Sequence, residues 1–344
     1  RFRQRRSTMP EHTFRIVPVN ADNATFVGSV FQSVYGDNFP VKYVYQPLLV
    51  LQEIQERRLS ASLAFDEAGN PVGYISLFKS APNLRLWEGG NLVVNPLFKH
   101  STLASHLFNH YLTADSGSLL EGDGIYTEAV CHHYFTQVSC AKFGLQDCAI
   151  ELDQLDGSSF KDGRAETERV ACVLNFKELS EPPVLQYLPT QYMEMLTHLA
   201  EPLRPRTFRP ALSPLPTDGS TRWEDSYHES ARTWKISVWE IGADWLAIVE
   251  QLLSQAKARG VISLQLTLNT ASPHLGAGVS VLQQHGFFLG GLIPRWFGTD
   301  GVLMQQVLGK KPDFDGIKLY TKTAKKLLEY IRAEYNQVTQ ITES

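Results

Sequence analysis

One structural unit occurs twice in this sequence, and it constrains the fold more than any other feature. Each copy has an apolar strand, a short polar turn, a helix, a glycine followed by an apolar residue, and a second strand. The first copy covers residues 125–152, with Gly144 after its helix, and the second begins at Ile262, with Gly286 in the same place. Alternating strands and helices are typical of layered α/β folds, and a glycine commonly ends a helix. The repeat predicts an α/β protein of two related halves, unless two unrelated α/β units resemble each other by chance.

Apolar periodicity extends this pattern over most of the chain. In the first half we expect strands at residues 12–19, 60–66, 72–80, 84–94, 124–130, 145–152 and 166–176, and helices at 22–34, 48–54, 101–113 and 135–143. In the second half we expect strands at 223–230, 233–241, 261–269, 287–294 and 301–308, and helices at 245–258, 276–285 and 321–335. The first half then has the order β-α-α-β-β-β-α-β-α-β-β, a mixed α/β (α+β) sheet.

Proline-rich stretches separate the two halves. They lie at residues 182–183 and 202–216. We therefore predict five segments: a disordered basic tail at 1–9, a first domain at 10–180, a linker and domain junction at 181–218, a second domain at 219–310, and a helical extension at 311–344.

Composition limits the classes of function. The 344 residues carry a formal net charge of -4, so a nucleic-acid partner is not expected. The arginines of the basic tail leave nucleic-acid recruitment open as an alternative. No apolar run reaches the roughly 20 residues that span a bilayer, so no membrane association is expected. The four cysteines form no CxxC pair, which predicts reduced thiols, a cytoplasmic location and no metal site.

The stretch from Leu92 to Leu112 carries a second motif, in which an apolar strand, a proline step, a short loop and a helix follow one another. It resembles the cofactor motif of the GNAT superfamily of acyl-CoA N-acyltransferases, whose loop reads Arg/Gln-x-x-Gly-x-Gly/Ala. Lys99 takes the Arg/Gln place, Thr102 the first glycine and Ala104 the second small residue. Thr102 departs from the family by carrying a side chain there. The resemblance implies two fused GNAT-like domains, the C-terminal one degenerate, that use acetyl-CoA or another acyl-CoA.

The chemistry of this loop agrees with the resemblance. A diphosphate needs main-chain N–H donors and the positive end of a helix dipole, and a strand that turns into a helix offers both. An ordinary strand–helix connection, whose helix only packs on the sheet, is the alternative. The residues that would hold the cofactor are Val93, Val94, Lys99, His100, Ser101, Thr102, Leu103 and Ala104.

The resemblance also implies direct acyl transfer, in which a base takes a proton from an amine and an acid protonates the leaving thiolate. The superfamily often has a tyrosine four residues before the helix-ending glycine, and this chain has Cys140 there. Cys140 is either that acid or a small buried residue. Glu88, on the strand before the loop, is either a base or a solvent-facing residue. His132 and His133, at the end of the next strand, either act as a base or grip a carboxylate, or one of them caps the following helix and the other is exposed.

The acceptor pocket is expected between the first two helices and at the end of the strand near residue 130. Its candidate residues are Tyr35, Asp37, Phe39, Tyr45 and Glu128. Aromatic rings with interspersed polar groups suit a small amine or a protein lysine, and the alternative is that the aromatic residues only pack a long loop. A homodimer is compatible with the sequence.

The second half has lost the cofactor motif. Its corresponding loop lacks small residues and places Asp244 where a phosphate would lie. Asn269, His274, Arg295 and Trp296 are expected either to line a groove or to serve packing and capping. We expect an enzyme, an N-acyltransferase; the alternative is a catalytically silent module that binds an acyl-CoA or a metabolite.

Overall fold

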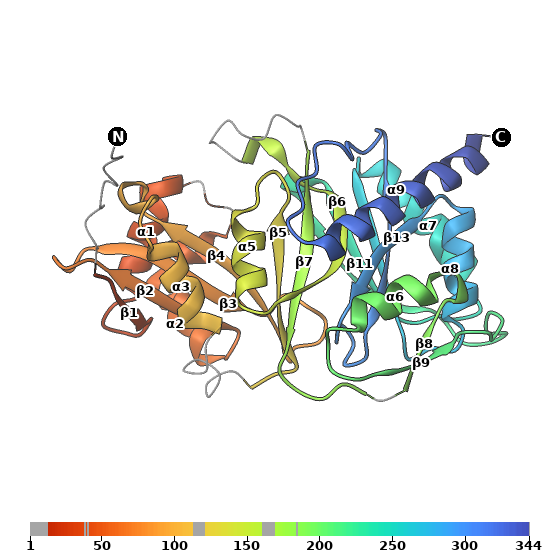
Figure 1. Cartoon of the computed structure of the whole chain (residues 1–344), viewed down its shortest axis with the longest axis horizontal. Coiled ribbons are helices and arrows are strands. Elements are labelled where there is room, and N and C mark those ends of the chain that lie inside the picture. The colour runs from red at the N-terminus through yellow and green to blue at the C-terminus, as the bar shows by residue number, and fades with distance from the viewer. Residues whose placement is uncertain are drawn as a thin grey trace, which may run out of the picture. The chain divides into compact units, whose positions relative to one another are not determined.

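The computed structural model describes residues 13–37, 39, 41–112, 121–159, 169–183 and 185–343. The chain forms two compact units, one made of Arg1–Lys79 with Glu88–Glu121 and the other of Ser80–Trp87 with Gly122–Ser344. Each unit combines strands and helices in layers (Figure 1), so the predicted α/β class is confirmed. The units divide the chain at other places than the predicted domains do. The predicted basic tail lies outside the described residues.

The first unit is an antiparallel sheet in the order β1-β2-β3-β4. Its strands are β1 (Arg15–Pro18), β2 (Leu59–Phe65), β3 (Pro71–Phe78) and β4 (Leu86–Val94), and its helices are α1 (Thr25–Tyr35), α2 (Pro47–Gln55) and α3 (Leu103–Leu112). Short 3-10 turns, η1 (Lys42–Tyr45) and η2 (Pro96–Phe98), precede α2 and α3. The core forms where the apolar face of α1 meets β2 and β3, around Phe31, Leu63 and Tyr74.

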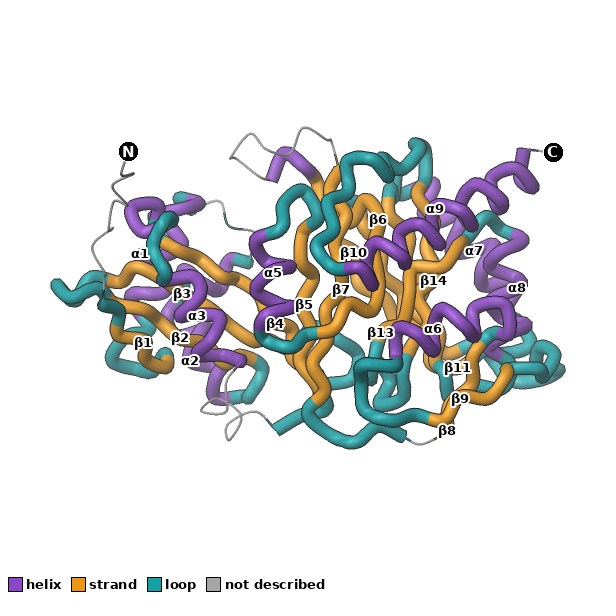
Figure 2. The backbone as a smooth tube through the Cα atoms, viewed as in Figure 1, coloured by secondary structure: helices purple, strands orange, loops and turns teal. Residues whose placement is uncertain are grey.

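The second unit has a sheet in the order β5-β7-β6-β13-β14-β12-β11-β10. Figure 2 shows the strands in orange and the helices in purple. Its strands are β5 (Gly124–Val130), β6 (Gln146–Asp156), β7 (Arg169–Glu178), β10 (Arg222–His228), β11 (Thr233–Glu240), β12 (Ser263–Asn269), β13 (Phe288–Ile293) and β14 (Gly301–Val307). Its longer helices are α5 (Phe135–Lys142), α7 (Trp245–Ala258), α8 (Leu275–Gln284) and α9 (Lys322–Glu343), and α9 packs on β6 and β13.

The repeat seen in the sequence is also a repeat in the structure. β7 lies between β5 and β6, and β14 lies between β12 and β13, so each copy has the same strand order around its helix. Gly144 and Gly286 both have positive φ, at 79° and 89°. After each glycine, the amide of the next residue bonds back across the helix end, Leu145 to the Cys140 carbonyl and Phe287 to the Leu282 carbonyl, both at 3.0 Å. These are matching glycine-terminated helix ends.

The segment predicted as a linker is structured, which corrects that part of the prediction. Residues 181–218 contain β8 (Leu185–Leu188), α6 (Met193–Ala200) and β9 (Thr207–Pro210), with β8 and β9 paired in parallel. Leu188, Leu196 and Leu199 are completely buried in the core of the second unit. The prolines flank these short elements rather than replace them, because β9 ends at Pro210 and Pro202 follows α6.

The last helix, α9, is longer than predicted and amphipathic. It runs from Lys322 to Glu343, and it buries Leu327 and Ile331 while its lysines face outward. Within the described ranges, no helix combines the length and the apolar character needed to cross a membrane.

Candidate functional site

The loop between β4 and α3 is held at both ends by side-chain hydrogen bonds. The Oδ1 atom of Asn95 accepts a hydrogen bond from the amide of Leu97 at 3.0 Å. The hydroxyl of Ser101 accepts from the amide of Leu103 at 3.2 Å and donates to the Phe98 carbonyl at 2.7 Å. Ser101 therefore caps α3, which begins at Leu103 rather than at the predicted residue 101.

Alternate main-chain amides of this loop are available. Across the described part of the chain, the amides of His100, Thr102 and Ala104 have no hydrogen-bond acceptor, whereas those of Lys99 and Ser101 donate to carbonyl groups three residues earlier. Free N–H groups at the positive end of a helix dipole attract anions. The loop thus supplies three of the donors that a diphosphate would need.

The charges around this loop favour the same kind of ligand. The side chains of Lys99 and His100 are exposed, and the first turn of α3 contains no acidic residue. Thr102 also has an exposed side chain, in the place where the GNAT loop has a glycine. The loop therefore carries a positive charge, and the side chains that flank its free amides are exposed to solvent.

The position of α3 is set by a glycine on the sheet. A Cβ atom on Gly73 would lie 2.9 Å from the Cδ1 atom of Leu107 and 3.2 Å from the Cδ2 atom of Leu103. The absence of a side chain on β3 lets the helix approach the sheet closely. Leu103 and Val93 are buried and Val94 is half-buried. Of the predicted cofactor residues, these three belong largely to the core, so their contribution to a ligand would come from the main chain.

A bulge in β4 was not predicted from the sequence. Tyr74 of β3 lies opposite Val93, but Ser76, two residues later, lies opposite Gly90, so β4 has one extra residue. Asn91 lies within this bulge with φ of 53°. β11 has a bulge in the corresponding place of the second copy, where Trp239 is the extra residue opposite β10. Bulges interrupt strand pairing and are frequent beside functional sites; the available sequence signal was the run of two glycines and an asparagine at 89–91.

Glu88 lies in the first unit together with the loop. It is half-buried on β4, in register with Phe78 of β3 and three residues before Asn91 of the bulge. A partly buried carboxylate on the strand that leads into the loop is compatible with the predicted role of a base.

In the first unit, the residues predicted to bind the acyl acceptor make their contacts mainly within the loop between α1 and α2. The Tyr45 hydroxyl donates to the Gly36 carbonyl at 2.7 Å and accepts from the Phe39 amide at 3.1 Å. The rings of Tyr35 and Phe39 lie 5.0 Å apart and join the aromatic core. Burial, and then the nearby Tyr45, raises the pKa of Tyr35, so its hydroxyl stays protonated. Asp37 is exposed. These contacts fit the packing alternative better than an open pocket.

Glu128, predicted to bind substrate, is engaged in an ion pair within the second unit. Lys235 of β11 binds the carboxylates of both Glu128 and Glu151, the latter at 2.9 Å. Gln154 donates to the other oxygen of Glu128 at 3.0 Å. Burial alone would lower the pKa of Lys235, but the two carboxylates outweigh it and raise the pKa above its usual value. Sequence reasoning missed Lys235 and Glu151 because they come from strands far apart in the chain.

His132 and His133 lie next to each other in the turn between β5 and α5. Their ring centroids are 4.3 Å apart in an edge-to-face arrangement. His132 is buried and borders a small cavity of about 20 Å³ with Asp153 and Arg169. The turn brings both rings together, and the cavity beside His132 is too small for an amine substrate, so the role of a base stays a prediction.

Cys140 is completely enclosed in the second unit. Its Sγ atom lies 3.3 Å from the Thr127 hydroxyl, and burial raises the pKa of the thiol to about 12. The thiol is protonated but solvent does not reach it. Its surroundings agree with the alternative of a small buried residue.

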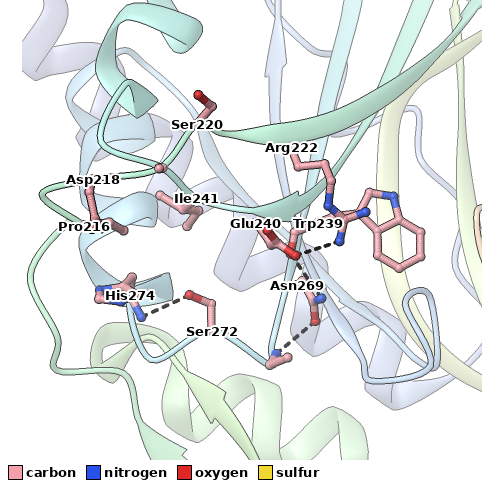
Figure 3. Close-up of a pocket in the computed structure, with 13 residues that line it drawn as sticks. Pro216, Asp218, Ser220, Arg222, Trp239, Glu240, Ile241, Asn269, Ser272 and His274 are labelled. Atoms are coloured by element: carbon pink, nitrogen blue, oxygen red, sulfur yellow. Dashed lines mark hydrogen bonds and ion pairs between the residues drawn. The ribbon is translucent and has the colours of Figure 1, made fainter.

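Two of the four residues that were predicted to line a groove in the second half line a cavity, and the other two do not. Asn269 and His274 line a cavity of about 410 Å³ (Figure 3). Arg295 is instead buried, with its guanidinium 3.1 Å from Asp123, and Trp296 is buried with its indole N–H 2.9 Å from the Ser237 hydroxyl. For these two residues the contacts agree with the packing alternative.

Comparison with protein-family models gives no match, and comparison with curated proteins gives none either. Among solved structures, the spermidine/spermine N-acetyltransferase of Vibrio cholerae is 15% identical over 48% of this chain and 93% of its own, with a TM-score of 0.38. A protein assigned to the GNAT acetyltransferases of Desulfovibrio desulfuricans is 17% identical over 49% of this chain and 99% of its own, with a TM-score of 0.35. A protein assigned as a phosphinothricin N-acetyltransferase is 17% identical over 49% of this chain and 100% of its own, with a TM-score of 0.37.

All three matched structures are acetyltransferases by name, and the first unit together with β5–β7 follows the element order that the sequence predicted for the GNAT resemblance. Each match covers about half of this chain. Acyl group and acceptor have to be argued from the residues themselves.

Proposed function

We propose that this chain is an acyl-CoA-dependent N-acyltransferase that transfers an acyl group, with acetyl as the first to test, to a primary amine of a small molecule or of a protein lysine. The observation that carries the proposal is the loop before α3, where the amides of His100, Thr102 and Ala104 are free beside the exposed Lys99. The four cysteines of the chain are buried and unpaired, which agrees with the cytoplasmic location that belongs to the same proposal.

The residues of this loop fit the diphosphate of coenzyme A. The free amides donate hydrogen bonds to phosphate oxygens, Lys99 neutralises part of their charge, and the dipole of α3 adds to the attraction. Ser101 holds the loop in this form through its two hydrogen bonds. The thioester of the bound cofactor supplies the acyl group.

Proton transfer from the amine is assigned to Glu88. Its half-buried position on β4 excludes part of the solvent, and it comes from the strand that leads into the cofactor loop. A positioned general base typically contributes a factor of about 10²–10⁴ to the rate. We assign no role in catalysis to Cys140, because its thiol is enclosed.

A second candidate function is a module that binds acyl-CoA without catalysis. The enclosed Cys140 favours it, because this position is where the superfamily often carries its acid. The two functions share the cofactor loop and differ only in whether thiol is released.

Two measurements on the full chain test the proposal. Native mass spectrometry with a mixture of acyl-CoAs should show a bound acyl-CoA, and thiol release from that acyl-CoA should require an amine. Glu88→Gln should reduce kcat/KM by about 10²–10⁴ without changing binding, whereas the exposed control Glu250→Gln should change neither. Binding without thiol release for every amine tested would establish the silent module, and failure to bind any acyl-CoA would refute both functions.

A further inference from the structure

The cavity of the second unit lies at a place where layered α/β proteins bind ligands. β11 and β12 are parallel neighbours, paired from Thr233 and Ser263 up to Val238 and Leu268, with α7 connecting them. The cavity opens beyond that last pair and is lined by residues that follow each strand (Figure 3). Ligands of open α/β sheets bind at the carboxyl ends of strands, and a volume of about 410 Å³ suits a small molecule.

This cavity is closed to a diphosphate by the chain itself. The amide of Gly242 donates to the Thr221 hydroxyl at 3.0 Å, and the amide of Ala243 donates to the Gly219 carbonyl at 3.0 Å. A Cβ atom on Gly242 would lie 2.4 Å from the main-chain nitrogen of Thr221, so residues 219–221 lie directly on the start of α7. The Asp244 carboxylate accepts from the Thr221 amide at 2.7 Å. The donors that an anion would need are therefore used within the protein.

The remaining polar groups of the cavity are mainly hydrogen-bond acceptors. The carboxylates of Asp218 and Glu240 lie on different sides of it in Figure 3, and Asp218 has no partner among the residues that the structure describes. His274 bonds through Nδ1 to the Pro214 carbonyl. Since a carbonyl only accepts, Nδ1 is the donor in this hydrogen bond, and Nε2 is the ring nitrogen left without a bond to the described part of the protein.

The one guanidinium of the cavity is already occupied. Arg222 pairs with Glu240 at 2.8 Å and lies over the Trp239 ring at 5.1 Å from its centroid. The Trp239 ring is thus already in contact with the Arg222 guanidinium, and the faces of indole rings generally attract cations. With two carboxylates and one paired guanidinium, the cavity has a net negative charge.

We propose that this cavity binds a small molecule that carries a primary ammonium group, and that it does not bind coenzyme A. An ammonium has three donors and no acceptor, which suits a cavity whose lining includes the Asp218 and Glu240 carboxylates. This site is separate from the proposed acyl transfer, so either can fail without the other.

Isothermal titration calorimetry of the full chain at low salt tests the site, with 1,4-diaminobutane as the probe and butane-1,4-diol as its uncharged counterpart. The diamine should bind and the diol should not. Asp218→Asn and Glu240→Gln should each weaken diamine binding about threefold to fivefold, whereas Glu250→Gln, an exposed change on α7, should leave it unchanged. Ala271→Trp should fill the cavity and abolish binding without a change of charge.

The same variants separate this cavity from any acceptor site elsewhere in the chain. Thermal unfolding checks that each variant is folded. Diamine binding that survives Ala271→Trp, equal binding of the diol, displacement of the diamine by coenzyme A, or the absence of diamine binding would each overturn the proposal.

Discussion

α3 and α7 each lie between a bulged strand and a copy of the repeat, yet the charges at their starts differ in sign. Before α3, three amides are free and a lysine and a histidine are exposed beside them. Before α7, the amides of Gly242 and Ala243 are bonded to residues 219–221, and carboxylates surround the loop. The two copies therefore share their strand order, while the contacts at the helix start before each copy differ.

The amides at the two helix starts differ because of the segment that precedes β10. In the second copy, the segment before β10 crosses the start of α7 and uses its donors. Each of the following predictions changes one member of this comparison.

The largest effect is expected from Gly242→Ala. The added methyl group would lie 2.4 Å from main-chain atoms of Ser220 and Thr221, which cannot move aside as a side chain would. Overpacking of this kind costs up to about 3 kcal/mol of the free energy of unfolding, measurable by urea denaturation. Gly28→Ala on α1 is the matched control, since its nearest contact would be an ordinary 3.5 Å. Equal stability of Gly242→Ala and the parent would show that residues 219–221 do not press on α7.

Thr102→Glu should weaken coenzyme A binding by about 30-fold, corresponding to about 2 kcal/mol. The new carboxylate would lie at the positive end of α3 and compete with the diphosphate for the free amides. Calorimetric titration with coenzyme A measures the loss. Two controls carry the same charge: Asn109→Glu, further along α3, and Ala243→Glu, at the equivalent start of α7. If all three weaken binding equally, the α3 loop is not the diphosphate site.

The sequence predicted most of the helices and strands, but not β8, α6 and β9, and not the contacts that decide the site. Apolar periodicity predicted α7 at its observed bounds, and the repeated strand–helix–glycine pattern placed Gly144 and Gly286 at helix ends. It could not show that Lys235 meets Glu128, or that residues 219–221 cover Gly242, because those contacts join segments far apart in the chain. The same limit applies to Arg295 and Trp296, whose partners Asp123 and Ser237 come from other strands and loops.

Cys140 and Leu282 occupy the same place in the two copies, and the pH dependence of stability should report their difference. Burial raises the pKa of the Cys140 thiol to about 12 in the folded chain, while an unfolded thiol titrates at about 8.5. The stabilising contribution is complete below that lower value and is lost as pH rises toward the folded pKa. From pH 8 to pH 10 the parent should lose about 2 kcal/mol more than Cys140→Ala, measured by urea denaturation. An equal loss in both proteins would mean that the thiol ionises as readily folded as unfolded.

The smallest effect concerns the two bulges. Asn91 in β4 has φ of 53°, whereas Trp239 in β11 is not among the described residues with positive φ. Asn91 also donates from Nδ2 to the Ser76 hydroxyl at 3.3 Å. Asn91→Ala should therefore cost about 1 kcal/mol, since alanine tolerates left-handed backbone poorly, and Asn91→Gly should cost less.

Urea denaturation of these two variants, with the exposed Asn109→Ala as a control, separates backbone strain from loss of the hydrogen bond. A larger loss for glycine than for alanine would mean that the amide contact to Ser76, and not the backbone conformation, selects asparagine at the bulge. A larger loss for alanine than for glycine would show that the bulge in β4 keeps a strained backbone at Asn91. The bulge in β11 has no such strain at Trp239.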